Sequence, residues 1–252
     1  MTSKGTRTLW VWLGLFTAVV FLLAVLAMPY VRQYNAVKWV HDQGGSVLTE
    51  ATWITARLPS TATAWLSDKG WLVSVERVTV VNLWDTQVSD AGLEHLEGLA
   101  DLRKLNLNDT PVTDAGLEHL KDLTALERLG LNNTQVNGAG LAHLKGMTAL
   151  NHLYLDDTPV TDVGLEHLKG MTAIQSLHLY GTQVTDAGLE HLKGIAALEQ
   201  LYLGDTQVTD DGLEHLRGMT ALTGLLLRST QVTQAGVDDL QAALPSLNIS
   251  GP

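Results

Sequence analysis

The residues that most suggest chemistry are histidines, because six of the nine in the chain recur at a fixed interval of 24 residues. They are His95, His119, His143, His167, His191 and His215. A ladder of imidazoles suggests a metal site. However, a shared metal requires each imidazole nitrogen about 2.0 to 2.1 Å away, whereas packed helices lie about 8 to 10 Å apart. We therefore expect no metal site, and we interpret the column as the half-covered flank of a surface helix.

No constellation of residues suitable for catalysis stands out. The 252-residue chain has no cysteine, which excludes a thiolate nucleophile and a cysteine-based zinc site. It contains no GxSxG, HExxH or phosphate-loop pattern. Its acid–lysine pairs have the spacing of weak pairs on a helix surface, and they are Glu118 with Lys121, Glu166 with Lys169, and Glu190 with Lys193. We expect no enzyme activity, no cofactor and no small-molecule substrate.

The 24-residue interval organises most of the chain. Units begin at Val78, Leu102, Leu126, Leu150, Ile174, Leu198 and Leu222. Each opens with an LxxLxL pattern, as at Leu102, Leu105 and Leu107. This pattern predicts a short strand with inward apolar side chains, and stacked copies predict a parallel sheet with strands about 4.8 Å apart. Because helices are wider than strands, the sheet should form the concave side of an α/β solenoid, with short helices on the convex side.

Other columns with the same interval predict structural roles. A threonine column, from Thr86 to Thr230, should place buried hydroxyls on turn backbone groups. A valine column two residues later should bury the turn. An aspartate column that includes Asp114 should cap the following helix. A glycine column that includes Gly116 should let that helix pack closely against the sheet.

The TDAGLEHL segment at residues 113–120 and its counterparts resemble the convex helices of bacterial leucine-rich repeats, a variant related to the helix-bearing repeats of F-box and ribonuclease-inhibitor proteins. The resemblance recurs seven times over residues 78 to about 249, roughly two-thirds of the chain. One departure is threonine where many such repeats have asparagine. The resemblance implies a curved solenoid with a protein-binding role, and membrane-tethered members are familiar in bacteria. No F-box segment is present, so ubiquitin-ligase function is not implied.

The side chains that differ between units lie at the third, fifth and seventh positions, on the sheet face that points away from the core. Tyr154, His178 and Tyr202 should be successive members of one column there. Aromatic side chains supply large contact areas with little loss of entropy, as in binding hot spots. We predict a partner-binding set of Trp84, His152, Tyr154, His178, Tyr180 and Tyr202. The alternative is a packing ladder without a ligand.

The N-terminal segment is strongly apolar. Residues 1–8 form a short tail, and residues 9–30 are predicted to be a single transmembrane helix. Residues 8–31 carry no charge, and 24 helical residues span about 36 Å, against about 30 Å of bilayer hydrocarbon. A cleaved signal peptide is the alternative, although its apolar core runs only about 7 to 15 residues. Basic residues on the two flanks nearly balance, and we expect the repeats on the extracytoplasmic side.

Between the membrane segment and the repeats, residues 31–63 are predicted to form a juxtamembrane helix and a linker. The helix should place four apolar side chains near one face, namely Val31, Tyr34, Val37 and Val40. Residues 64–77 are apolar enough to cap the first repeat, with a partner-binding peptide as the alternative. The solenoid at residues 78–252 should close with a shortened unit that contains Leu244, Leu247 and Ile249.

The charge balance limits the class of partner. Lys and Arg total 16 against 27 for Asp and Glu, a formal net charge of −11, which opposes general affinity for nucleic acid or anionic lipid surfaces. We therefore predict a membrane-tethered leucine-rich repeat module that binds a protein or peptide through its concave face. The alternative is a structural or spacing solenoid that self-associates without a specific ligand, which the uniformity of the convex face favours.

Overall fold

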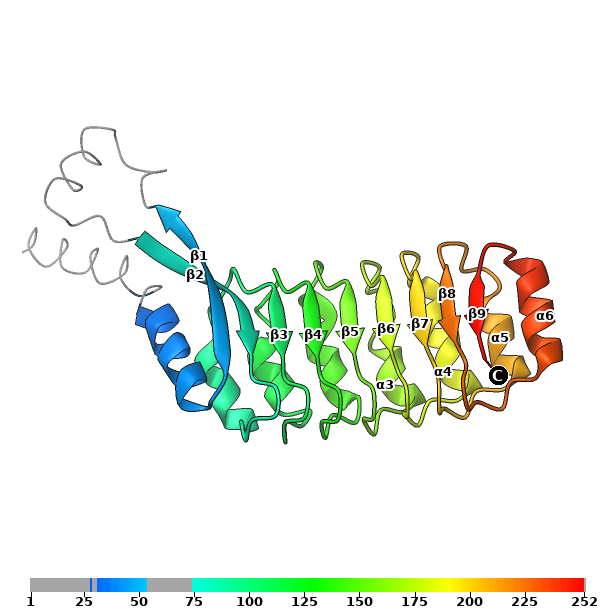
Figure 1. Cartoon of the computed structure of the whole chain (residues 1–252), viewed down its shortest axis with the longest axis horizontal. Helices are drawn as coiled ribbons and strands as arrows, with labels where there is room; N and C mark the ends of the chain where they lie inside the picture. The colour runs from blue at the N-terminus through cyan, green and yellow to red at the C-terminus, as the bar shows by residue number, and fades with distance from the viewer. Residues whose placement is uncertain (1–27, 29–30, 54–73, 252) are drawn as a thin grey trace, which may run out of the picture.

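The computed structural model describes residue 28, residues 31–53 and residues 74–251. These residues form a nine-stranded sheet in which strand order follows chain order (Figure 1). β1 is antiparallel to β2, and every later neighbouring pair is parallel. The strands are β1 Ser46–Trp53, β2 Ser74–Asn82, β3 Lys104–Asn106, β4 Arg128–Gly130, β5 His152–Tyr154, β6 Ser176–His178, β7 Gln200–Tyr202, β8 Gly224–Leu226 and β9 Asn248–Ser250. The predicted parallel sheet of the repeats is confirmed.

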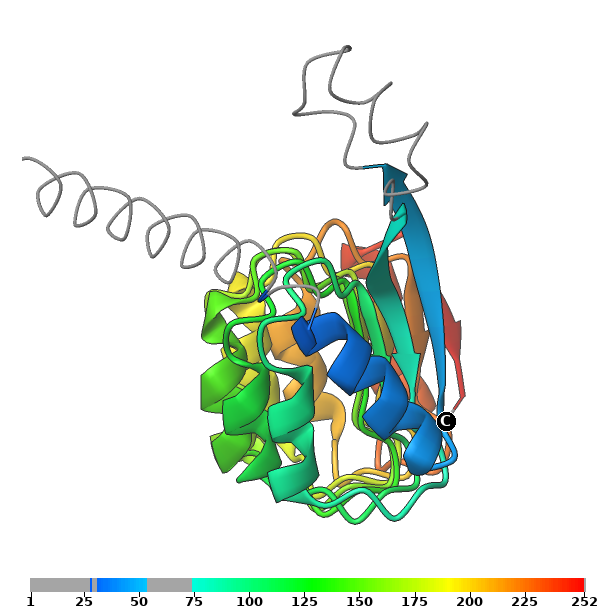
Figure 2. The same ribbon diagram turned by 90° about the vertical axis from the view of Figure 1, so that its left-hand side faces the viewer.

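Each repeat returns through a short α- or 3-10 helix. Figure 2 shows the sheet on one side of the molecule and these helices on the other. The helices are η2 Asp90–Leu96, η3 Gly116–Leu120, η4 Ala139–Gly146, α3 Asp162–Glu166, α4 Asp186–Glu190, η5 His191–Gly194, α5 Asp210–Leu213, η6 Glu214–Leu216 and α6 Gln234–Ala243. The two layers enclose the leucines of the LxxLxL pattern and the valine column, which are buried in one continuous core.

The threonine column satisfies backbone groups at the strand exits, as predicted. In all seven units the hydroxyl donates to the carbonyl oxygen of the leucine three residues earlier, at 2.6 to 2.7 Å. The first six threonines are at most 8% exposed. In the first, fifth and seventh units the backbone N–H of the same threonine also donates to this oxygen, at 3.2 to 3.3 Å. The hydroxyl makes the shorter bond in these units, and such buried carbonyl oxygens need a donor.

A second column at the strand exits was not recognised in the sequence. The residue before each threonine has a left-handed backbone, with φ between 52° and 67°. These residues are Asp85, Asp109, Asn133, Asp157, Gly181, Asp205 and Ser229. Glycine, asparagine and aspartate enter this region more readily than other residues, which explains every member of the column except Ser229.

The aspartate column was wrongly predicted to cap its own helix. Asp186 instead accepts hydrogen bonds from the backbone N–H and the hydroxyl of Thr209 in the next repeat, at 2.8 and 2.7 Å. Thr209 itself caps α5 by accepting a hydrogen bond from the Asp211 backbone N–H. Equivalent bridges between repeats join Asp90 to Thr113, Asp162 to Thr185, and Asp210 to Thr233. The aspartates therefore tie successive repeats together.

The glycine column also packs differently from the prediction. A Cβ added at Gly212 would lie 2.3 Å from Oδ1 of Asp186 in the preceding repeat. The glycines thus allow neighbouring helices to approach each other, rather than the sheet. The column of bridges is interrupted at Gly138, whose φ is 113° and which lies against Gly164. The third repeat therefore offers no carboxylate to Thr161 of the fourth.

Residues upstream of the repeats cover the first unit. A helix over residues 31–42 buries Ala36 and Val40 in the core, and β1 extends the sheet beside β2 (Figure 1). The Trp39 ring lies 5.1 Å from the His95 ring on η2, measured between centroids. Residues 31–53 therefore cap this end of the solenoid.

The predicted apolar face of the helix was wrong in its first half. Val31 and Tyr34 are 55% and 70% exposed, whereas Val40 is buried. Val31 and Val40 are nine residues apart, which at about 100° per residue places them on roughly opposite sides of a helix.

Several predicted segments lie outside the described residues. They are the tail at residues 1–8, residues 9–30 of the membrane segment apart from Met28, the linker at residues 54–63, and residues 64–73 of the predicted cap. Across residues 31–53 and 74–251, no helix combines the length and apolar character that a bilayer crossing requires.

The C-terminal end closes with β9, which pairs in parallel with β8. Leu244 and Leu247 are buried under this strand. Nε2 of Gln241 donates to the carbonyl oxygens of both leucines, at 3.1 and 2.9 Å. The end of the core is therefore covered by both apolar and hydrogen-bonded contacts.

Candidate partner-binding face

The sheet face consists of the side chains at the third, fifth and seventh positions of each unit. Strand register pairs Tyr154 with His178 and His178 with Tyr202. Their rings form a continuous aromatic column, with centroid distances of 4.5 Å and 3.9 Å. The second pair is stacked, with 15° between the ring planes. The structure therefore brings together the three residues that the 24-residue interval placed in one column.

His152 extends the aromatic column sideways. Its ring stacks on Tyr154 with 6.4 Å between centroids, and its Nδ1 lies 2.5 Å from Oδ1 of Asn151. Burial lowers the pKa of His152, and the positive charge of Arg128 lowers this pKa further. The imidazole is therefore neutral at pH 7, which suits a surface that is desolvated when a partner binds.

Tyr180 borders the aromatic column through a shared carboxylate. Its backbone N–H donates to Oδ1 of Asp156 at 2.9 Å, while Oδ2 of the same aspartate lies 3.6 Å from Nδ1 of His178. The side chain of Tyr180 is 42% exposed and lies over Gly204, which leaves room for the ring. Tyr180 is thus part of the same patch.

Trp84 is separate from that patch. It follows β2, so β3 and β4 lie between it and Tyr154. Its indole Nε1 donates to Oδ2 of Asp109 at 2.6 Å, and its side chain is 59% exposed. Five of the six predicted binding residues therefore lie together, and Trp84 stands apart from them in the first repeat.

A pocket of about 460 Å³ lies on the sheet face between these two regions. Its lining includes Lys104 and Arg128, four asparagines, Gly130, and Tyr154 from the aromatic column. The repeat pattern alone did not predict this pocket. The available signal was Gly130, because a glycine at the fifth position leaves a gap between Asn106 and Tyr154 in a column that otherwise carries side chains.

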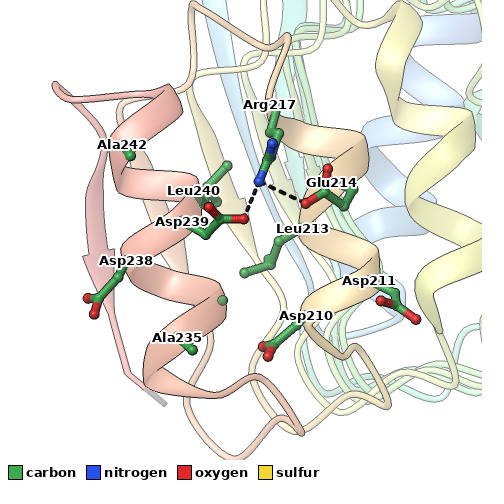
Figure 3. Close-up of a pocket in the computed structure, with 11 residues that line it drawn as sticks. Asp210, Asp211, Leu213, Glu214, Arg217, Ala235, Asp238, Asp239, Leu240 and Ala242 are labelled. Carbon is green, nitrogen blue, oxygen red and sulfur yellow. Dashed lines mark hydrogen bonds and ion pairs between the residues drawn. The ribbon is translucent and has the colours of Figure 1, made fainter.

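A larger pocket of about 630 Å³ lies on the helix side, against α5, η6 and α6 (Figure 3). Five carboxylates line it, and its cation, Arg217, already pairs with Glu214 and Asp239 (Figure 3). Another lining carboxylate, that of Asp210, is held by Thr233. Most of its charged groups are thus already paired within the fold, so the sheet face is the stronger candidate.

The histidine column lies on the helix side, as expected. His95 is exposed and the other five are half-buried. Nδ1 of His119 lies 2.7 Å from Oε1 of Glu97 in the preceding repeat. Within the described residues, no three histidine or acidic side chains are arranged to hold a metal ion.

Parallel strands, one short helical return per 24 residues and leucines between the layers define a leucine-rich repeat solenoid. Residues 99–121 match the family model described as a leucine rich repeat. A search among curated proteins finds no match to the chain.

Two solved structures from Listeria monocytogenes share this fold. An internalin (inlF) has a TM-score of 0.58 and 24% identity, over 74% of this chain and 52% of its own. An internalin C2 (inlC2) has a TM-score of 0.55 and 24% identity, over 77% of this chain and 93% of its own. The chain thus spans about half the length of the first. At this identity the likeness shows the fold.

Proposed function

We propose that this chain is a membrane-tethered leucine-rich repeat module that binds a protein or peptide through its sheet face. The observation that carries the proposal is the aromatic column of Tyr154, His178 and Tyr202, flanked by His152 and Tyr180. The rings are held against one another, so little conformational entropy remains to be lost on binding. Tyrosines also offer a large apolar area with a hydroxyl at its edge, which is why they dominate binding hot spots.

An affinity measurement with a partner captured by the full chain tests this proposal. Tyr202→Ala should weaken binding by about 2 kcal/mol or more, roughly thirty-fold, because it removes a ring at the end of the column. Substituting Glu118, Glu166 and Glu190 with alanine on the helix side provides the control, which should leave affinity unchanged. Loss of binding in the helix-side variants, with the tyrosine variant unaffected, would place the working face on the helices.

Self-association without a ligand is the competing function. Sedimentation of the full chain in detergent distinguishes the two. The proposed binding role requires that Tyr202→Ala change partner affinity and leave the oligomeric state unaltered.

The tether is residues 9–30, with the repeats on the extracytoplasmic side. Its support is the uncharged stretch at residues 8–31, which is long enough to cross the bilayer hydrocarbon. Carbonate should fail to extract the full-length chain from membranes, and protease added outside sealed cells should digest the repeats. Release by carbonate would contradict the tether, and protection of the repeats would contradict the orientation.

A further inference from the structure

The pocket beside Tyr154 has an unusual charge for this chain. The chain carries a formal net charge of −11, yet the pocket lining contains two cations, Lys104 and Arg128, and no carboxylate. The two cations come from adjacent strands, where the register pairs one with the other, at a spacing of about 4.8 Å. Both side chains are exposed at the rim.

Neither cation is neutralised within the described residues, where no carboxylate pairs with Lys104 or Arg128. Other basic residues are paired: Arg77 lies 3.0 Å from Asp101, and Arg103 lies 3.6 Å from Glu127. The nearby carboxylate of Asp109 is occupied, because it accepts hydrogen bonds from Trp84 and Asn133. The pocket therefore has positive charge to offer.

Backbone hydrogen bonds orient the side chains of the pocket asparagines. Oδ1 of Asn106 accepts from the backbone N–H of Asn108, at 3.0 Å. Oδ1 of Asn108 accepts from the backbone N–H of Asn132, at 2.9 Å. Backbone N–H groups can only donate, so they fix which amide atom is the oxygen. The same pattern holds for the other two asparagines, Asn82 with Trp84 and Asn132 with Asp156.

The amide nitrogens of these asparagines consequently remain available. Among the described residues, no group accepts a hydrogen bond from Nδ2 of Asn82, Asn106, Asn108 or Asn132. The pocket thus presents an ammonium and a guanidinium, while the amide oxygens of Asn106 and Asn108 lie nearest the gap at Gly130. The ligand class that such a lining recognises is an acceptor with negative charge.

We propose that this pocket receives the carboxylate of an aspartate or glutamate in an extended segment of a protein partner, while the neighbouring residues of that segment lie on the aromatic column. A carboxylate matches the planar fork of Arg128 and, at the strand spacing, also reaches Lys104. Tyr154 borders both the pocket and the column, so one segment can occupy the two together. The inference rests on the proposed function and names the chemistry of the partner.

A single carboxylate suits the site better than a polyanion. Only two cations line the pocket, and a densely sulfated chain or nucleic acid extending beyond them would meet the net negative charge of the protein. The carboxylate of Asp156 lies 3.6 Å from His178 of the aromatic column and would repel a second negative charge there. Side chains next to the bound carboxylate should therefore be uncharged.

The experiment selects peptides from a randomised 12-residue phage library on the full chain in non-ionic detergent. Enriched sequences should contain one Asp or Glu beside aromatic or aliphatic residues. The most enriched peptide is then synthesised, together with a second peptide in which Asn or Gln replaces the acidic residue. Calorimetry should show roughly ten- to hundred-fold weaker binding for the amide peptide, because a charged hydrogen bond is lost.

Protein variants complete the cycle. The double substitution Lys104→Ala and Arg128→Ala should weaken binding of the acidic peptide by a similar factor. It should leave the affinity for the amide peptide unchanged. The matched control is Arg228→Ala, which removes an exposed cation of the sheet face outside the pocket and should change neither affinity.

The outcomes separate this inference from the proposed function. Enriched peptides whose binding depends on Tyr202 but that carry no carboxylate would overturn the pocket assignment. So would an equal loss of affinity for the acidic peptide in Arg228→Ala. Either result would leave the sheet face as the binding surface. A selection that enriches no peptide would also overturn it. Binding of heparin that requires Lys104 and Arg128 would replace the acidic segment with a sulfated glycan. Peptides indifferent to every sheet-face substitution would overturn both proposals.

Discussion

At the scale of single residues, positions that are identical in every repeat differ in role from positions that vary between repeats. Each strand-exit threonine recurs because its hydroxyl satisfies a carbonyl oxygen inside its own repeat. The position of the aromatic column is not uniform, because it carries asparagine, glycine, tyrosine, histidine or leucine in different units, and its neighbours on the sheet face also change from unit to unit. A position that repeats is therefore explained by the fold, whereas a departure from the repeat calls for another explanation.

Thr134→Val tests the role of the threonine column. The substitution keeps the shape and removes the donor to the Leu131 carbonyl oxygen, a bond of 2.7 Å. The free energy of unfolding should fall by about 1 to 2 kcal/mol in urea denaturation. Thr223→Val, at an exposed hydroxyl that donates to the Glu199 carbonyl oxygen, should change it by less than about 0.5 kcal/mol. Equal losses would contradict the argument from burial.

His152 should make stability depend on pH. Its pKa is lowered in the folded state, so the unfolded chain takes up the proton first as the pH falls below about 6.5. Stability present above that pH is therefore lost as the pH falls toward the folded pKa. In His152→Gln, the urea midpoint should drop less between pH 7.5 and pH 5 than in the unsubstituted chain. An unchanged or larger drop would be inconsistent with burial of a neutral imidazole.

The sequence was sufficient to predict the aromatic column, because a fixed interval places Tyr154, His178 and Tyr202 on adjacent strands. It was not sufficient for the pocket. Whether Gly130 leaves a pocket depends on the asparagines around it. Their oxygens lie 2.7 and 3.1 Å from the position that a Cβ at Gly130 would take.

At the scale of elements, the helical returns are held together by bridges that the sequence did not reveal. Recurrence showed that aspartate is required before each helix, but an N-cap and a bridge to the next repeat demand the same residue type. Only the structure distinguishes them, since the threonine that each aspartate holds is 23 residues further on. The interruption at Gly138 provides a natural comparison within the chain.

Thr185→Ala and Thr161→Ala form a matched pair. Both side chains are half-buried at the start of a helix. Thr185 donates to Oδ2 of Asp162 and caps α4, whereas Thr161 makes no capping bond and has Gly138 in place of the aspartate. Thr185→Ala should lower the free energy of unfolding by about 1 to 2 kcal/mol, and Thr161→Ala by about 0.5 kcal/mol. The reverse order in urea denaturation would refute the bridging role.

At the scale of the whole molecule, periodicity identifies the middle of a solenoid and says little about its ends. Every internal strand has six other copies to support its assignment. The helix over residues 31–42 occurs once, so its docking beside η2 through Trp39 had no repeat signal. Caps at both ends could still be predicted, because the apolar core of a solenoid must be covered at either terminus.

Removing either end should lower stability. A fragment of residues 74–252 lacks β1 and the contacts of Ala36 and Val40, so its melting temperature should fall by at least about 5 °C relative to residues 31–252. Deleting residues 244–252 from the longer fragment removes β9 and should have a similar effect. Differential scanning calorimetry provides the measurement, and an unchanged melting temperature would show that the deleted end does not cap the core.

The central claim is that the sheet face, and not the helix side, contacts the partner. Site-specific photo-cross-linking tests it most directly, with a benzophenone amino acid placed at Tyr202 or, on the opposite layer, at Glu166 in membranes that carry the full chain. The account predicts a discrete cross-linked protein from position 202 and none from position 166. A cross-link that forms from position 166 and is absent from position 202 would contradict it.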